Sequence, residues 1–470
     1  MIRGWRIASP LSFRMSSKIS ILFYNPDTAG VAYYRTLMPA LRLQKDFPDD
    51  FHVEINQNVD WNNLDYLRQF QIIHGHRTLC DYPHMERLMV ILRKEGIKVV
   101  LDIDDFWEVH QDHPVREIVK NEGLSAKTRA NLAMVDYVTT TTEQFAKYIR
   151  PINKNVVVIP NGVDDTEDQF KLKEKTASER TRLMWLGGSS HEADINLLKD
   201  SMQRLASDDM LRSKVQLHLV GYDLRGTHTE MVVNQQMLQE LHDLKLVTAT
   251  IMSNLQRSGW DIDAVKEIPL ILKNRYRGKV ISSSTRDIQP LETVWYRYEQ
   301  VFTSNYKLLE DKSYERFLKT FNLAAEYPNQ MTTQPYIRHA TKGVHQFANA
   351  YRHADICLAP IKVFGKNPSD QYQFAKSNLK AIEAGFHKVP LIASEVPTYT
   401  GDPDFIDGKN IVFVKAGRQE KDWFKKIKEL VNNPNMVTDL GEAAYELVSK
   451  KYSLKTITEK RKDFYQEITK

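Results

Sequence analysis

A chain of 470 residues is too long for one hydrophobic core, so the sequence predicts two or three domains. Its 42% hydrophobic and 27% charged residues are usual for a soluble globular protein, and no run of 18 apolar residues predicts a transmembrane helix. The two cysteines, Cys80 and Cys357, exclude a disulfide framework and a cysteine-rich zinc site, and they suit a reducing compartment. The net charge of +5 is compatible with a membrane-surface or nucleic-acid partner without requiring one.

The chain opens with an extension, residues 1–16, ahead of the first expected strand. It is rich in arginine but lacks a continuous apolar core, so we expect a disordered tail or an upstream start codon rather than a targeting signal. The first strand is expected at Ile19–Tyr24, and a loop with one glycine, Gly30, leads from it into a helix. This order opens a nucleotide-binding type of βα unit, although one glycine is too few for a dinucleotide fingerprint.

Residues 17–165 alternate between strand and helix patterns, which predicts a doubly wound parallel sheet with ligands at the carboxyl ends of its strands. Two expected strand ends carry side chains suited to chemistry. His76 follows one of them, and Asp104 and Asp105 follow the other. Aspartates at such positions also fit a simple cap-and-turn cluster. Further strands are expected at 51–55, 70–74, 97–102, 135–140 and 156–159.

A second α/β domain is expected over residues 181–452, after a charged linker at 166–180. Its first strand, Arg182–Leu186, precedes a glycine loop whose backbone N–H groups could bind an anion. Residues 222–340 form an insertion in which aromatic and basic residues interleave. That pattern fits stacking on sugar rings or bases, and it also fits ordinary packing.

The most informative stretch, residues 374–394, predicts a short helix, a glycine turn and a buried parallel strand. Lys376, Lys380 and Glu383 lie on one helix face, and Ser377 is placed to cap the helix N-terminus, where unpaired N–H groups favour an anion. A cation and a carboxylate two turns apart could hold a diphosphate and a ribose diol. A solvated pair of Lys380 and Glu383 explains the same residues without a ligand.

Two motifs resemble glycosyltransferase family 4, whose members have the GT-B fold. Lys380-Ala-Ile-Glu-Ala-Gly, followed by Val389-Pro-Leu-Ile-Ala-Ser, is similar to the family's C-terminal nucleotide-sugar site. Pro160-Asn-Gly-Val-Asp is similar to the point where GT-B chains leave the N-terminal domain. The Tyr33-Tyr-Arg entry to the first helix fits a subgroup common in phage and bacterial glycan clusters.

The resemblance covers most of residues 17–470 outside the insertion. It implies two Rossmann-like domains facing a cleft, with residues 453–470 forming a helix that crosses back to the N-terminal domain. It also implies transfer of a sugar from a nucleoside diphosphate sugar to an acceptor hydroxyl, with retained configuration and without a metal or other cofactor. We therefore expect a cytoplasmic enzyme whose partners are a nucleotide sugar and a glycan or lipid-linked acceptor, with peripheral membrane contact left open.

The resemblance also assigns site residues by position. The expected catalytic residues are Asp104, Asp105 and His76. Glu383 is expected on the donor ribose, Lys376 on the diphosphate, and Arg35 on the phosphates or the acceptor unless it is only a surface arginine. The expected donor-binding residues are Gly30, Arg35, Gly187, Gly188, Ser189, Lys376, Ser377, Asn378, Leu379 and Glu383.

The sequence departs from the family pattern at three places. Asp104-Asp105 replaces a His-Asp pair, and Ser189-Ser190-His191 replaces a segment with a phosphate-binding arginine. Ala375 occupies the place of the first glutamate in the family's Glu-x7-Glu pair. Lys376 and the helix N-terminus would then have to neutralise the diphosphate.

Other hypotheses stay open at this point. The acceptor could be a hydroxymethylated pyrimidine of phage DNA, given the basic chain and the aromatic-basic insertion. The departures also fit a GT-B protein that binds a nucleotide sugar without turnover, whereas a nucleotide-sugar 2-epimerase would need acid residues for which no motif is found. Asp102-Ile-Asp104 matches the metal motif of GT-A glycosyltransferases, although its place in the first of two α/β halves argues against that fold.

Overall fold

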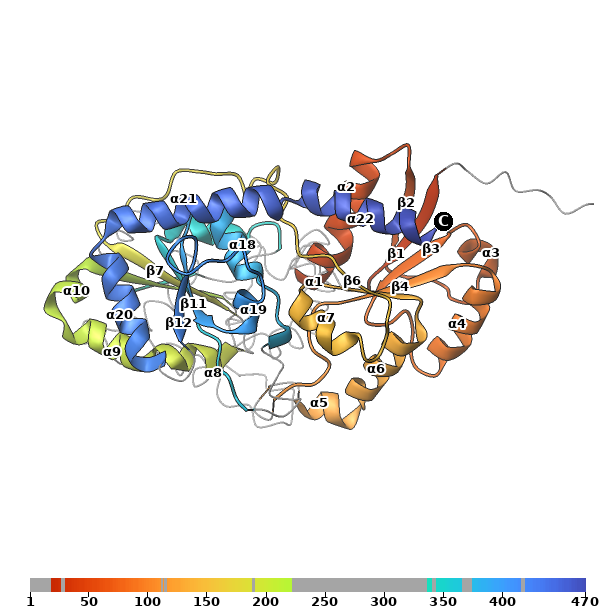
Figure 1. The fold of residues 1–470 in the computed structure, drawn as a ribbon, viewed down its shortest axis with the longest axis horizontal. Coiled ribbons are helices and arrows are strands. Elements are labelled where there is room, and N and C mark those ends of the chain that lie inside the picture. Colours follow the sequence, from red (N-terminus) through yellow and green to blue (C-terminus); the bar gives the residue numbers. More distant parts are fainter. Residues whose placement is uncertain are drawn as a thin grey trace, which may run out of the picture.

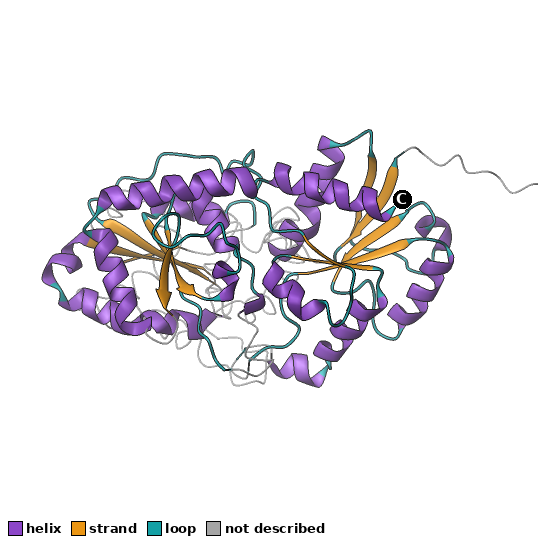
Figure 2. Cartoon of the chain, viewed as in Figure 1, coloured by secondary structure: helices purple, strands orange, loops and turns teal. Residues whose placement is uncertain are grey.

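A computed structural model shows two α/β domains side by side, each with a parallel sheet between helices (Figures 1 and 2). The N-terminal domain runs from red to yellow in Figure 1 and the C-terminal domain from yellow-green to blue, but the last helix returns to the N-terminal domain. The extension, and all of the expected insertion except 336–339, lie outside the described residues. The structure describes residues 18–26, 30–110, 113, 116–187, 191–221, 336–339, 344–365, 374–415 and 419–470.

Six parallel strands form the N-terminal sheet in the order β2-β1-β3-β4-β5-β6. Their β-branched and aliphatic residues are mostly buried, as strands covered on both faces require. The strand order reverses at β1, and ligands of such sheets bind at the carboxyl ends near this reversal. The strands are β1 (Ile19–Tyr24), β2 (Phe51–Asn56), β3 (Ile72–His76), β4 (Lys98–Ile103), β5 (Tyr137–Thr140) and β6 (Val156–Val158).

Helices cover both faces of this sheet. On one face, Met85, Leu88 and Leu92 follow a helical period and pack on the strands. The helices before the second domain are α1 (Gly30–Ala32), the π-helical turn η1 (Tyr33–Leu37), α2 (Met38–Asp46), α3 (Leu64–Leu67), α4 (His84–Lys94), α5 (Arg116–Asn121), α6 (Leu124–Met134) and α7 (Glu143–Ile149).

The C-terminal sheet has the strand order β12-β11-β10-β7-β8-β9, and all its paired strands are parallel. Two parallel sheets of this kind confirm the predicted pair of Rossmann-like domains. The strands are β7 (Thr181–Gly187), β8 (Val215–Gly221), β9 (Tyr336–His339), β10 (Ile356–Ala359), β11 (Leu391–Glu395) and β12 (Val412–Lys415).

Helices also cover both faces of the C-terminal sheet. Helix residues such as Met202 and Trp423 pack on one face, and helix residues such as Ile382 and Val448 pack on the other. The segment before β10 is a 3-10 helix, η5. The helices are α8 (Glu192–Ile195), η3 (Asn196–Leu198), α9 (Lys199–Ser207), α10 (Asp209–Lys214), η5 (Phe347–His353), α18 (Leu379–Phe386), α19 (Pro397–Thr400), α20 (Gln419–Val431) and α21 (Pro434–Lys451).

The last helix, α22 (Leu454–Ile468), packs on the N-terminal sheet, where Ile457 and Tyr465 join the core formed with Ile21. Figure 1 shows α22 beside α2, far from the C-terminal sheet. Gly162 lies where the chain leaves the N-terminal domain, and a Cβ atom there would come within 3.0 Å of the Leu454 backbone. The glycine therefore permits a close contact between the departing and the returning chain.

A pair of tyrosines connects the two cores. Tyr33 and Tyr34 precede α2 in the N-terminal domain, yet they are buried in the same hydrophobic cluster as Tyr351 and Ile382 of the C-terminal domain. Both occupy η1, and π-helical turns of this kind are frequent at functional sites. Helix α1, which leads into η1, lies on the side of its domain that faces the other domain (Figure 1).

Candidate interdomain site

Helix α18 begins at Leu379 with Asn378 in the N-cap position, so the predicted cap at Ser377 is wrong. The Asn378 side chain makes no capping bond, and its amide lies 3.3 Å from the Tyr452 hydroxyl. Gly385 brings α18 close to α21, because a Cβ atom there would meet the Val448 methyl groups at 2.9 Å. Since α18 connects two parallel strands, its N-terminus lies at their carboxyl ends.

Two lysines stand at this helix N-terminus beside a histidine and an aspartate. Nδ1 of His191 lies 3.4 Å from Nζ of Lys376 and 2.7 Å from Oδ2 of Asp194, and Asp194 also accepts a 2.7 Å bond from the Lys362 backbone. Burial and then Lys376 lower the pKa of Lys380 to about 8. Burial and the two lysines lower the pKa of His191 to about 3, so this ring is neutral at pH 7. The cluster is therefore electropositive and suited to an anion.

The carboxylate of Glu383 is buried between two tyrosines. It accepts a 2.6 Å hydrogen bond from the Tyr34 hydroxyl and a 3.0 Å bond from the Tyr351 hydroxyl, and only 3% of the residue is exposed. Burial raises the pKa of Glu383 to about 7, although both tyrosines and Lys380 act against the rise. The sequence did not reveal these partners, since Tyr34 and Glu383 are 349 residues apart. A ribose would have to share or replace these bonds.

In the N-terminal domain, the three expected catalytic residues lie together at the ends of β3 and β4. Nε2 of His76 lies 2.9 Å from Oδ1 of Asp104, and Arg77 lies 3.5 Å from both Asp104 and Asp105. Arg77 has a positive φ of 59°, a conformation that residues other than glycine rarely adopt.

The two aspartates have opposite pKa shifts. Burial favours the neutral form of Asp104, but the hydrogen bond and charge of His76, together with Arg77, outweigh it and hold the pKa of Asp104 below its usual range. Burial and then the neighbouring Asp104 raise the pKa of Asp105. Asp104 is therefore the carboxylate that stays ionised, and two adjacent acids with separated pKa values are a recurrent feature of catalytic sites.

The charge of Lys376 acts on groups in both domains. It contributes to the low pKa of His191 in its own domain, and in the other domain it acts against the raised pKa of Asp105. The His110 ring stacks on Phe364 with centroids 4.1 Å apart, which joins the loop after β4 to the loop after β10. Lys376 thus lies between a carboxylate cluster and a cationic cluster.

Arg35 is buried inside the N-terminal domain. It is therefore not a surface arginine, and in this conformation it is not exposed to contact a donor. Its guanidinium bonds the Asp102 carboxylate at 2.9 and 2.7 Å, and it also reaches the Ile159 carbonyl and the Asn161 side chain. Only 1% of Arg35 is exposed. A buried carboxylate needs such a partner, which the spacing along the chain could not show.

The other predicted donor-binding residues are placed as follows. Gly30 begins α1, and a Cβ atom built there would have no other group within 4 Å among the described residues. Gly187 ends β7, where a Cβ atom would meet the Trp185 ring at 2.5 Å. Ser377 and Leu379 flank Asn378 at the start of α18 and are half-buried. Gly188 and Ser189 lie outside the described residues.

No protein-family model matches the sequence, and no curated protein sequence matches it significantly. Solved structures do match over nearly the whole chain. Sucrose-phosphate synthase from Thermosynechococcus elongatus is 13% identical with a TM-score of 0.54, over 96% of this chain and 99% of that chain. A glycosyltransferase from Rickettsia africae is 13% identical with a TM-score of 0.51, over 96% and 99%. HepE from Anabaena, in complex with UDP and glucose, is 10% identical with a TM-score of 0.51, over 96% and 100%.

The chain has the GT-B fold. The alternative that Asp102-Ile-Asp104 belongs to a GT-A enzyme is therefore wrong. The two clusters lie in different domains, and the charge of Lys376 in one acts on Asp105 in the other. Among the described residues, no group of three or more histidines, cysteines or acids is placed to hold a metal ion, and no helix is long and apolar enough to cross a membrane.

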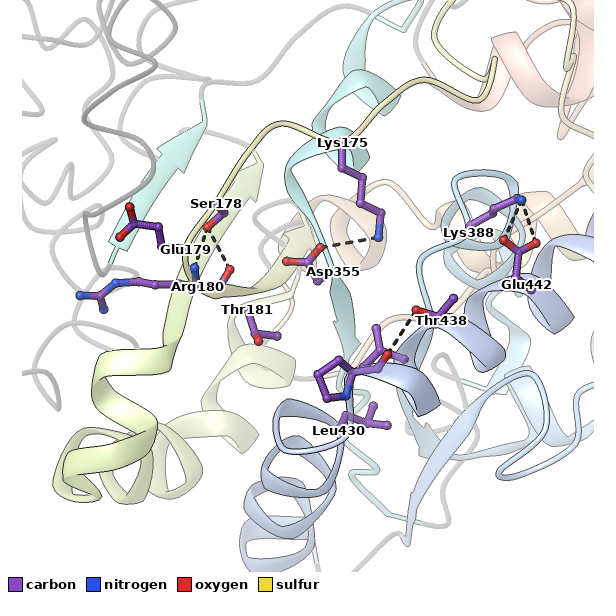
Figure 3. A pocket seen from close by; sticks show the side chains of 12 residues that line it. Lys175, Ser178, Glu179, Arg180, Thr181, Asp355, Lys388, Leu430, Thr438 and Glu442 are labelled. Atoms are coloured by element: carbon purple, nitrogen blue, oxygen red, sulfur yellow. Dashed lines mark hydrogen bonds and ion pairs between the residues drawn. The ribbon is translucent and has the colours of Figure 1, made fainter.

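A separate cavity of about 500 Å³ lies at the opposite end of the C-terminal sheet, where β7 begins (Figure 3). Its walls carry both charges, and two of its three acids form ion pairs: Asp355 binds Arg182 and Lys175, and Glu442 binds Lys388. The cavity is remote from the Gly187 end of β7 and from the interdomain site.

Proposed function

We propose that the chain is a glycosyltransferase that moves a sugar from a nucleoside diphosphate sugar to an acceptor hydroxyl, with retained anomeric configuration and without a metal ion. The observation that carries this proposal is the position of Lys376, whose ammonium group stands at the start of α18, beside Lys380 and between the domains. A diphosphate leaving group requires positive charge and unpaired backbone N–H groups, and this place supplies both.

The donor would lie on the C-terminal domain. Lys376 and Lys380 would neutralise the diphosphate, and Glu383 would accept hydrogen bonds from the ribose hydroxyls. HepE, which shares the fold, was solved with UDP and glucose, so a UDP-sugar is the first donor to test. The low pKa of Lys380 fits this role, because a half-buried ammonium group gains most from an arriving anion.

The acceptor would approach from the N-terminal domain, where His76 and Asp104 form a hydrogen-bonded pair. An ionised carboxylate at this place can bond a sugar hydroxyl and stabilise the positive charge that develops on the sugar ring. We propose same-face attack, which needs no protein nucleophile. A glycan or a lipid-linked saccharide is the proposed acceptor.

The test is a screen of the full chain against UDP-, GDP-, ADP- and TDP-sugars, with melting temperature and nucleotide release as readouts. We expect one nucleotide to raise the melting temperature and to be released slowly from its sugar, and the anomeric configuration of the product then tests retention. Binding without release in the presence of glycan, lipid-linked and hydroxymethylated-DNA acceptors would favour a non-catalytic GT-B protein. If no nucleotide stabilises the chain, the proposal is wrong.

A further inference from the structure

The hydroxyl of Tyr34 crosses from one domain to a carboxylate of the other. Tyr34 lies on η1 of the N-terminal domain, and its ring is 94% buried in the C-terminal core beside Tyr33, with ring centroids 4.9 Å apart and nearly perpendicular planes. Its hydroxyl donates to Oε1 of Glu383 at 2.6 Å. The orientation of this carboxylate therefore depends on residues from both domains.

The partner that completes the arrangement comes from the C-terminal domain itself. Tyr351 of η5 donates to Oε2 of Glu383 at 3.0 Å, so each carboxylate oxygen has one tyrosine donor. An ionised carboxylate oxygen can accept more than one hydrogen bond, which leaves acceptor capacity for ligand hydroxyls. Two donors from opposite directions fix both the position and the plane of the group.

The turn that carries Tyr34 is itself anchored to the chain between the domains. The Tyr33 hydroxyl donates to Glu167, and Gln169, which bonds the same glutamate, also donates to the Val344 carbonyl at 2.9 Å. The His345 ring packs edge-on against Tyr33 at 5.2 Å. Because of this anchoring, the position of the Tyr34 hydroxyl depends on the contact between the two domains and not on the Tyr34 side chain alone.

We propose that Tyr34 is a positioning residue that orients Glu383 for the ribose of the donor from the opposite domain, so that the nucleotide site is complete only while the domains are docked. This inference rests on the proposed function, because it takes Glu383 as the ribose acceptor. It assigns to the N-terminal domain a part in binding the nucleotide, which the C-terminal domain would otherwise bind alone.

The surroundings of Glu383 give this role a pH signature. The groups that face it are Tyr34 of η1, Tyr351 of η5, Lys380 of its own helix, Cys357 of β10 and Tyr399 of α19. Burial raises the pKa of Glu383 to about 7, and the two hydroxyl donors oppose that rise. Ribose hydroxyls donate to the ionised carboxylate, so nucleotide affinity should fall on acidification through this pKa, and loss of a tyrosine hydroxyl should move the fall to higher pH.

The experiment measures the dissociation constant of the nucleotide found in the screen, between pH 5.5 and 8.5, for the wild type, Tyr34→Phe and Tyr351→Phe. Phenylalanine keeps the buried ring, so the core stays packed while one charged hydrogen bond is lost. We expect binding at pH 7 to weaken about tenfold in each variant, with a midpoint at higher pH and partial recovery at pH 8.5. Tyr66→Phe is the matched control, since its hydroxyl bonds Glu54 within the N-terminal domain.

A double-mutant cycle separates positioning from support of the fold. In a Glu383→Gln background, binding should lose the part of its fall on acidification that is centred near pH 7, and Tyr34→Phe should have little further effect. A Tyr34→Phe variant with wild-type affinity and midpoint, or with a loss of affinity equal at every pH, would overturn the inference while leaving the proposed function intact. If the wild type binds no nucleotide, the proposed function fails first and the inference fails with it.

Discussion

The guanidinium of Arg35 and the carboxylate of Asp102 form a buried two-bond ion pair, with N–O distances of 2.9 and 2.7 Å, beneath the strand ends of the N-terminal domain. The Thr139 hydroxyl adds a 2.6 Å bond to the same carboxylate. Because both charged groups are almost fully enclosed, each depends on the other. The pair supports the strand end from which Asp104 projects.

Arg35→Ala should therefore reduce stability rather than remove a ligand contact. Removing one partner of a buried pair leaves the other charge uncompensated, and we expect a loss of about 3–5 kcal/mol in the free energy of unfolding. Urea denaturation measures this, and Arg42→Ala, whose partly exposed guanidinium pairs with Asp46 and Asp164, serves as the comparison. A variant with wild-type stability but without nucleotide affinity would show that Arg35 contacts the donor.

Lys376→Ala should slow turnover by about a hundredfold, because it removes the cation that we propose neutralises the leaving group. Nucleotide affinity should weaken as well, while the melting temperature without ligand stays close to that of the wild type. Lys214→Ala is the matched control, since Lys214 is exposed and ends α10 just before β8 begins, at the other end of the sheet. Equal turnover in the two variants would show that Lys376 does not contact the diphosphate.

Asp104→Asn should lower the rate of transfer while sparing nucleotide binding, because Asp104 lies in the domain opposite the proposed donor site. The substitution keeps the shape but removes the negative charge, and we expect kcat to fall about a hundredfold. Steady-state kinetics and calorimetry with the nucleotide separate the two effects. A parallel loss of nucleotide affinity would place this residue against the donor rather than the reacting sugar.

Glu383 should make the stability of the unliganded protein depend on pH. Its pKa is raised to about 7 in the folded state, against 4.5 ordinarily, so the folded state binds the proton more tightly. The free energy of unfolding should therefore fall as pH rises from 4.5 to 7. Glu383→Gln removes this term, and the stability difference between variant and wild type should change by up to about 3 kcal/mol across that range.

Denaturation curves at pH 5 and pH 7.5 check this prediction. Glu446→Gln on the exposed side of α21 is the control and should show no such change. If the Glu383→Gln difference is the same at both pH values, the carboxyl group is not titrating in this window.

Much of the fold could be predicted from sequence. Alternating strand and helix patterns gave two parallel sheets, because strands buried on both faces are apolar throughout, and the GT-B fold is confirmed. Local boundaries were less exact. The strand expected at 70–74 lies at Ile72–His76, and the helix cap shifted from Ser377 to Asn378, because packing rather than capping preference fixes that end.

The partners of the site residues could not be predicted in the same way. Helical spacing placed Lys376, Lys380 and Glu383 near one another, since those contacts are local. Tyr34 meets Glu383 across 349 residues and Arg35 meets Asp102 across 67, and no local pattern records such pairs. The Tyr33-Tyr-Arg motif does not indicate either partner. Its second residue, Tyr34, is buried in the C-terminal core, and its third, Arg35, is buried in the N-terminal domain.

The return of α22 to the N-terminal sheet has a consequence for biosynthesis. The face of that sheet around Ile21 and Phe23 is covered by Phe464 and Tyr465, which a ribosome adds some 440 residues later. The first domain to emerge therefore keeps an uncovered apolar surface until residues 454–468 have been made. Chains that end early, before residue 454, should be captured by chaperones or degraded even though every residue of the proposed interdomain site has already been made.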